Sequence, residues 1–305
     1  MGIQRGMRGY GMCDSTGGAF DAAGSFDPAD AMQTGGSGML PAVIEKALKI
    51  PGVKVDRDAV LSKAFPHIGK ERLAAILDEE QGPQSVCSIE EMVAAAKRIV
   101  MSDTRKSTAI SFAAGLPANP FVVIPASGAD IAQYYAFALR MAQEVAYVFG
   151  RPQVFAEDGD LTSEGERDIM IYFGVMLGVA VANAGLMFIA RGLGQTASRK
   201  LMQKALMQTV WYPIIKKVAA AIGTQVTKKS ISNVVSKSVP IIGGVISGGL
   251  TYATFRPMGN RLVEAFARAL TASDEQVDAV AEQVLDTSVE GLAESDGWEV
   301  RNRNG

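Results

Sequence analysis

The stretch Ile169–Ala190, IMIYFGVMLGVAVANAGLMFIA, decides how the chain can fold. It is a run of 22 residues without a charged side chain, set between Asp168 and Arg191. A helix crosses a hydrocarbon core of ~30 Å with ~20 residues, so this run is long enough to span a membrane. The alternative is that the run is the buried centre of a helical domain.

The small residues of this run predict close packing against a second helix. Gly174, Gly178, Ala182 and Gly185 follow one another at spacings of four, four and three. Such spacing forms a groove that a second helix can approach closely, in membranes and in tight soluble pairs. A second uncharged run, residues 238–255, repeats the pattern. The positions that we expect to pack closely are Gly174, Gly178, Gly185, Gly243, Gly244, Gly248 and Gly249.

Topology argues against spanning. If both runs crossed a membrane, the basic segment between them would be cytoplasmic by the positive-inside rule. The flanking parts would then be exported, although MGIQRGMRGYGMCDSTGG lacks the apolar core of a signal peptide. We therefore expect a cytoplasmic chain with both runs in one bundle, and spanning stays an open alternative.

Charge is distributed very unevenly along the chain. No acidic residue lies between Asp168 and Glu264, whereas residues 271–305 carry nine acids against two arginines. This asymmetry predicts an anionic partner for the basic segment 191–237, which could be anionic lipid, nucleic acid or the acidic tail itself. The residues predicted to bind the membrane or an anion are Arg199, Lys200, Lys204, Lys216, Lys217, Lys228, Lys229 and Lys237.

Several chemistries are not expected. Cys13 and Cys87 are too few for a disulfide framework, which fits a reducing cytosol. The single histidine, His67, has no partner at ligand spacing, so we expect no metal, and no phosphate-binding loop or nucleophile elbow predicts a cofactor. Aromatic side chains that could stack on nucleobases are scarce in the basic segment, so nucleic acid is a poor candidate partner.

Hydrophobic periodicity and helix caps predict an all-α protein, a single large multi-helix bundle with Gly-rich, closely packed central helices. Residues 1–38 read as a disordered Gly/Ser-rich leader, 39–270 as the helical domain, and 271–305 as an acidic amphipathic helix and tail. Asp56 and the Ser88–Glu91 pair are predicted N-caps. A separate helix is expected over residues 260–270.

A polar stripe on the helix before the first run leaves an enzymatic alternative open. Asp130, Gln133, Arg140 and Glu144 recur on one helical face. The favoured interpretation is a buried polar seam in which Arg140 pairs with Glu144. The alternative is an uncharacterised enzyme in which Asp130, Arg140, Glu144 and the segment DTRKS (103–107) form a polar cleft.

The order of several segments resembles the EcsC family over roughly residues 39–270. The segments are IPGVKVDRDAVL, DTRKSTAISFAAGLPANP, DIAQYYAFALRMAQEVAYVFG, IMIYFGVMLGV, WYPIIKKVAAAIG with TKKS, and SKSVPIIGGVISGGLTYATFRPMGNRL. By position, the family's polar anchors would be Arg57, Thr104, Arg105, Lys106, Ser107, Asp130, Gln133, Arg140 and Glu144.

This resemblance implies a bacterial, helical protein at the cytoplasmic face of the plasma membrane, associated with a transporter and without an established catalytic activity. Together with the charge pattern it predicts a non-enzymatic peripheral membrane protein. Its partner would be an anionic lipid surface or a membrane protein, and a homo-oligomer is left open. A membrane-inserting effector is a further alternative, because helices with small-residue grooves can assemble in a bilayer.

Overall fold

The structure is a computed structural model that describes residues 42–78, 81–114, 127–156, 159–191, 216–222, 240–280 and 282. Helices make up 79% of this part, and none of its residues forms a β-strand. An isolated bridge pairs Phe155 with Leu161. The prediction of an all-α bundle is confirmed. The predicted leader lies outside the described residues.

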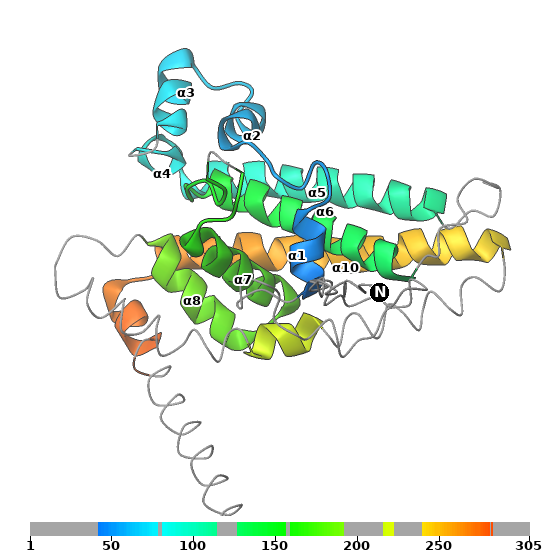
Figure 1. Ribbon diagram of the computed structural model, residues 1–305. Coiled ribbons are helices and arrows are strands. Elements are labelled where there is room, and N and C mark those ends of the chain that lie inside the picture. Colours follow the sequence, from blue (N-terminus) through cyan, green and yellow to red (C-terminus); the bar gives the residue numbers. More distant parts are fainter. Residues whose placement is uncertain are drawn as a thin grey trace, which may run out of the picture.

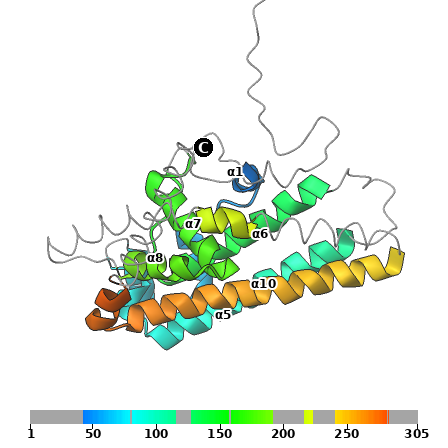
Figure 2. The same cartoon turned by 90° about the horizontal axis from the view of Figure 1, so that it is seen from below.

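Two long antiparallel helices form the axis of the bundle. α5 (Ile89–Ala114) and α10 (Pro240–Thr271) run side by side, so that Gly248 faces Phe112 and Gly259 faces Val100. α6 (Ser127–Val148) packs on both, and α7 (Ser163–Leu177) and α8 (Ala180–Ala190) cover only the half of α10 nearer its C-terminus (Figures 1 and 2). The outer ends of α5 and α10 therefore extend beyond α7 and α8.

Four short helices join at the N-terminal side. α1 packs against α6, and α2 packs against α5 and α6. Their bounds are α1 (Ala42–Leu48), α2 (Arg57–Ala64), α3 (Lys70–Leu77) and α4 (Pro83–Val86). Asp56 caps α2 by accepting from the Ala59 amide at 2.7 Å. Ser88 and Glu91 form the predicted reciprocal cap of α5, with bonds of 2.8 and 3.2 Å.

We interpreted the stretch 169–190 as a single helix, but in the structure it forms parts of two helices, α7 and α8. α7 ends at Leu177, and Gly178 adopts the left-handed conformation with φ +81°. The Gly178 amide donates to the Val175 carbonyl and the Val179 amide to the Gly174 carbonyl, which is the glycine-terminated Schellman arrangement. The chain then turns into α8. Within the described part of the chain, no helix is both long and apolar enough to cross a membrane.

In the second uncharged run, two elements that we predicted separately form a single helix. Residues 238–255 and 260–270 were predicted as separate elements, but residues from Pro240 to Thr271 form the continuous helix α10, with Pro257 inside it. A proline in a helix interior removes one backbone hydrogen bond. α10 nevertheless continues past Pro257, and it packs against α5 along much of its length.

Candidate functional site

The polar stripe on α6 meets a second polar group on α5. Arg140 Nη2 lies 2.8 Å from Glu144 Oε1, which is the predicted pair, and Arg140 Nη1 donates to the Gly52 carbonyl at 2.7 Å. On α5, Lys106 Nζ lies 2.9 Å from Asp103 Oδ1. Burial and the neighbouring Asp103 raise the pKa of Glu144 to about 7, against the opposing effects of Arg140 and Lys106. Glu144 therefore changes charge near neutral pH.

The polar residues of α5 and α6 line a cavity and do not form a closed polar seam between the two helices. A cavity of about 540 Å³ lies between α2, α5 and α6, and Lys106, Arg140 and Glu144 line it. The predicted convergence of Arg140, Glu144 and the 103–107 segment is therefore present in the described residues. The side chain of Asp130 lies outside them.

The other polar anchors occupy different surroundings. Arg57 is buried and donates to the carbonyls of Leu77, at 2.9 Å, and Ile76, so it holds α2 to the end of α3. Thr104 and Ser107 are buried on α5, and neither hydroxyl has a hydrogen-bond partner in the described structure. Arg105 is exposed and Gln133 is half-buried. The anchors therefore do not form one site.

Most of the predicted basic surface cannot be placed. Lys216 and Lys217 are exposed at the start of the helical segment 216–222, next to the buried Val218. The remaining predicted residues lie outside the described ranges: Arg199, Lys200, Lys204, Lys228, Lys229 and Lys237.

The glycines predicted to pack closely behave differently from one another. A Cβ on Gly174 would lie 2.5 Å from Ala182 Cβ and 2.8 Å from Val218 Cγ2, so this position admits only glycine without rearrangement. A Cβ on Gly248 would lie 3.2 Å from Phe112 Cβ. For Gly178 and Gly249 the prediction is wrong, because a Cβ at either position would meet nothing within 4 Å.

Two further glycines of the predicted set, Gly243 and Gly244, lie in α10 where the packing is not described. Gly185 is buried on α8.

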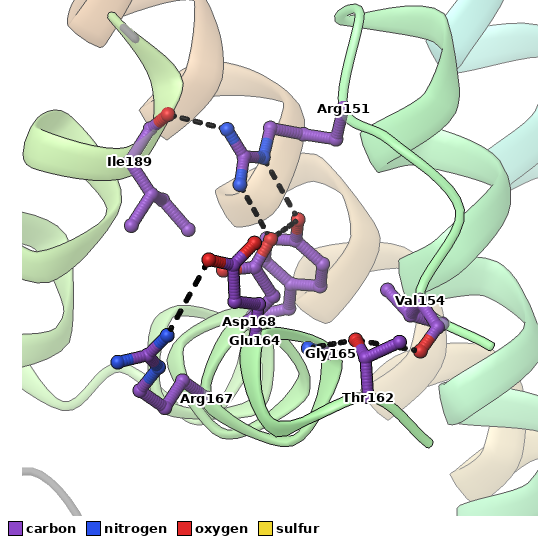
Figure 3. A network of polar contacts seen from close by, with 9 residues as sticks. Arg151, Val154, Thr162, Glu164, Gly165, Arg167, Asp168 and Ile189 are labelled. Carbon is purple, nitrogen blue, oxygen red and sulfur yellow. Dashed lines mark hydrogen bonds and ion pairs between the residues drawn. The ribbon is translucent and has the colours of Figure 1, made fainter. Parts of the chain in front are cut away.

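A buried ion pair that we did not predict joins the first half of α7 to the last turn of α8. Arg151 Nη2 donates to Asp168 Oδ2 at 2.6 Å, Arg151 Nη1 to the Ile189 carbonyl at 2.5 Å, and the Tyr172 hydroxyl to the same carboxylate at 3.0 Å (Figure 3). Burial and the Asp168 charge raise the pKa of Tyr172 well above its ordinary value. The signal in the sequence was Asp168 itself, a single acid directly before a long apolar stretch.

We also did not predict a group of exposed apolar side chains on α5 and α10. Four large hydrophobic side chains of the described chain are exposed, two in the last turns of α5 and two in the N-terminal half of α10, on the parts of these helices that extend beyond α7 and α8 (Figure 1). We call residues 104–114 and 248–256 the outer tip. Its exposed apolar side chains are Ile110, at 41% exposure, Phe112, at 41%, Leu250, at 38%, and Tyr252, at 37%. Exposed apolar residues gathered at one place are typical of interaction sites.

The beginning of the acidic tail contacts the beginning of the basic segment. Asp274 Oδ1 lies 3.2 Å from Arg191 Nη1, and Val277 is buried against Ala184 and Phe188 of α8. Of the acidic tail, residues 271–280 and 282 are described, and the others lie outside the described residues.

Comparisons of the chain with protein-family models, curated proteins and solved structures return no match. The resemblance to the EcsC family therefore stays a prediction from the sequence.

Proposed function

We propose that this protein is a peripheral membrane protein that binds anionic lipid bilayers through the outer tip of α5 and α10. The observation that supports the proposal is the gathering of the exposed apolar side chains Ile110, Phe112, Leu250 and Tyr252 on the parts of α5 and α10 that extend beyond α7 and α8 (Figures 1 and 2). Side chains of this kind enter the boundary between headgroups and acyl chains.

The charges of the tip fit a negatively charged surface. α5 has no acidic residue after Asp103, and α10 has none before Glu264. Arg105 and Arg256 are exposed within the tip, and Arg256 Nη1 donates to the Tyr252 hydroxyl at 3.1 Å. Each such base contributes about 1 kcal/mol near an anionic membrane surface. The basic segment 191–237 adds to this attraction in the proposal, with Lys216 and Lys217 as its exposed described residues.

Vesicle flotation tests the proposal. The full chain should float with vesicles of phosphatidylcholine and phosphatidylglycerol, and less with phosphatidylcholine alone. The double variant Phe112→Ser and Leu250→Ser should lose flotation, whereas the neighbouring exposed pair Ala113→Ser and Ala253→Ser should keep it. Equal flotation of the two double variants would contradict the role of the tip.

A charge series separates attraction from insertion. Arg105→Gln with Arg256→Gln should weaken flotation at low salt, and Arg268→Gln, at the opposite end of α10, should leave it unchanged. Release of a trapped dye from the same vesicles would favour the alternative of a membrane-inserting effector, and intact vesicles favour peripheral attachment.

A further inference from the structure

The cavity between α2, α5 and α6 has a basic rim and an apolar floor. Val55, Val60 and Ile99 contribute aliphatic surface, and the volume of about 540 Å³ is within the range of sites that enclose small organic molecules. Its described lining contains two acidic side chains, Asp56 and Glu144, against five basic ones, Lys54, Lys63, Arg98, Lys106 and Arg140.

Both acidic side chains of the lining already have partners within the protein. Asp56 caps α2 through its bond to the Ala59 amide. Glu144 pairs with Arg140 at 2.8 Å, and burial and Asp103 raise its pKa to about 7. Neither acid therefore neutralises the basic side chains at the other end of the cavity.

That other end is formed by Lys63 and Arg98. Arg98 Nη2 donates to the carbonyl of Ala64 at 3.0 Å, which places the guanidinium beside the last turn of α2, where Lys63 also lies. A guanidinium carries five N–H donors, so one bond to a carbonyl leaves others for a ligand. A basic group fixed in this way loses less conformational entropy when it binds an anion.

The cavity extends along α5 from Arg98 to Lys106. These residues are eight positions apart, which corresponds to about 12 Å along a helix. Ile99 and Ala95 of α5 and Val60 of α2 line the space between α2 and α5. An extended apolar group of several carbon atoms fits this length.

We propose that the cavity binds a small amphiphilic anion, with its carboxylate or phosphate at Lys63 and Arg98 and its apolar group on the aliphatic floor. This site shares Lys106 with the outer tip, but its anion-binding residues Lys63 and Arg98 lie outside the tip, and nothing in its argument depends on membrane attachment. Arg98→Gln should accordingly leave vesicle flotation unchanged.

Isothermal titration of the full chain with octanoate, octyl phosphate and octan-1-ol tests the proposal. At least one of the two anions should bind about tenfold or more tightly than the alcohol, the difference expected from one charge-assisted hydrogen bond. The stronger anion identifies the preferred acidic group. If neither anion binds more tightly than the alcohol, the proposal is wrong.

Two neighbouring residues provide matched variants. Arg98→Gln should weaken binding of the anion about tenfold, whereas Lys97→Gln, an exposed position outside the lining, should leave it unchanged. Ala59→Phe should block the cavity, because Ala59 lines it yet is exposed and tolerates a larger side chain. Urea unfolding of each variant verifies the fold. Equal losses in Arg98→Gln and Lys97→Gln, or full binding by Ala59→Phe, would overturn the assignment.

Discussion

The two uncharged runs look alike in the sequence but have opposite surroundings in the structure. Both are apolar, and both contain glycines four residues apart. In the first run, every residue from Ile169 to Met176 is buried. In the second, Leu250 and Tyr252 are exposed, and this part of α10 extends beyond α7 and α8 (Figure 1).

The difference follows from one backbone position. Gly178 takes a positive φ and ends α7, so the first run turns and packs its own halves together at Gly174 and Ala182. The second run has no such turn among its described residues and continues as one straight element. An apolar composition therefore predicts helix but not burial, because burial depends on where the chain reverses.

The largest expected effect is the loss of the ion pair that anchors the first run. Arg151→Leu leaves Asp168 buried without its cation and should lower the free energy of unfolding by about 4 kcal/mol. Arg167→Leu is the control, because its contact with Glu164 is 3.9 Å long and both side chains are exposed, so it should cost less than about 0.5 kcal/mol. Similar unfolding midpoints in urea for the two variants would show that the network does not stabilise the packing of α7 and α8.

A next prediction concerns the closest contact in the first run. Gly174→Ala brings a methyl group against Ala182 and Val218 and should destabilise the protein by about 2 kcal/mol, after the gain in helix propensity is included. Chemical denaturation measures this loss directly. An unchanged midpoint would mean that α7 and α8 separate easily.

The inner part of α10 should show a smaller loss. At Gly259→Ala the new methyl group would lie 2.6 Å from Val100 Cγ1 and 3.0 Å from Met141 Sδ. Ala182 Cβ, the atom nearest the new methyl group at residue 174, moves only with its backbone, whereas Val100 and Met141 can move by side-chain rotation, so we expect a loss of about 1 kcal/mol in the same denaturation experiment. A loss equal to that of Gly174→Ala would show that Val100 and Met141 accommodate a new methyl group no better than Ala182 does.

The outer part of α10 should respond in the opposite direction. Gly249→Ala meets no atom within 4 Å and should stabilise the protein by about 0.5 to 1 kcal/mol through helix propensity. Thermal unfolding would detect the rise. A loss of stability here would show that the outer part of α10 is covered in solution.

The smallest effect is expected at the exposed side chains of the tip. Leu250→Ser should change the free energy of unfolding by less than about 0.5 kcal/mol, because the side chain is exposed and lies outside the hydrophobic core. Differential scanning calorimetry in the absence of vesicles measures this. A large loss would indicate that Leu250 is part of the core.

Local signals in the sequence predicted the helices well. Asp56 and the Ser88–Glu91 pair cap the helices expected from them, and Arg140 pairs with Glu144 one turn away. These features depend on residues within four positions of one another. Gly178 was misread, because a glycine in an apolar run favours close packing and a helix end equally, and only the neighbouring chain distinguishes them.

Features that join distant segments could not be predicted. The Arg151–Asp168–Ile189 network and the cavity rim of Lys63 and Arg98 each depend on how helices from different parts of the chain pack. The outer tip likewise requires α5 and α10 to be placed side by side. Hydrophobic periodicity describes each helix alone and contains no information about its neighbours.

Fluorescence quenching by brominated lipid tests the central claim, membrane contact by the outer tip, most directly. Phe112→Trp would be prepared in a chain in which Trp211 and Trp298 are changed to Phe, and compared with Ala94→Trp, an exposed position at the inner end of α5. With anionic vesicles, we predict a blue shift and strong quenching for Phe112→Trp and neither for Ala94→Trp. Bound protein in which the two tryptophans are quenched equally, or only Ala94→Trp is quenched, would contradict the account.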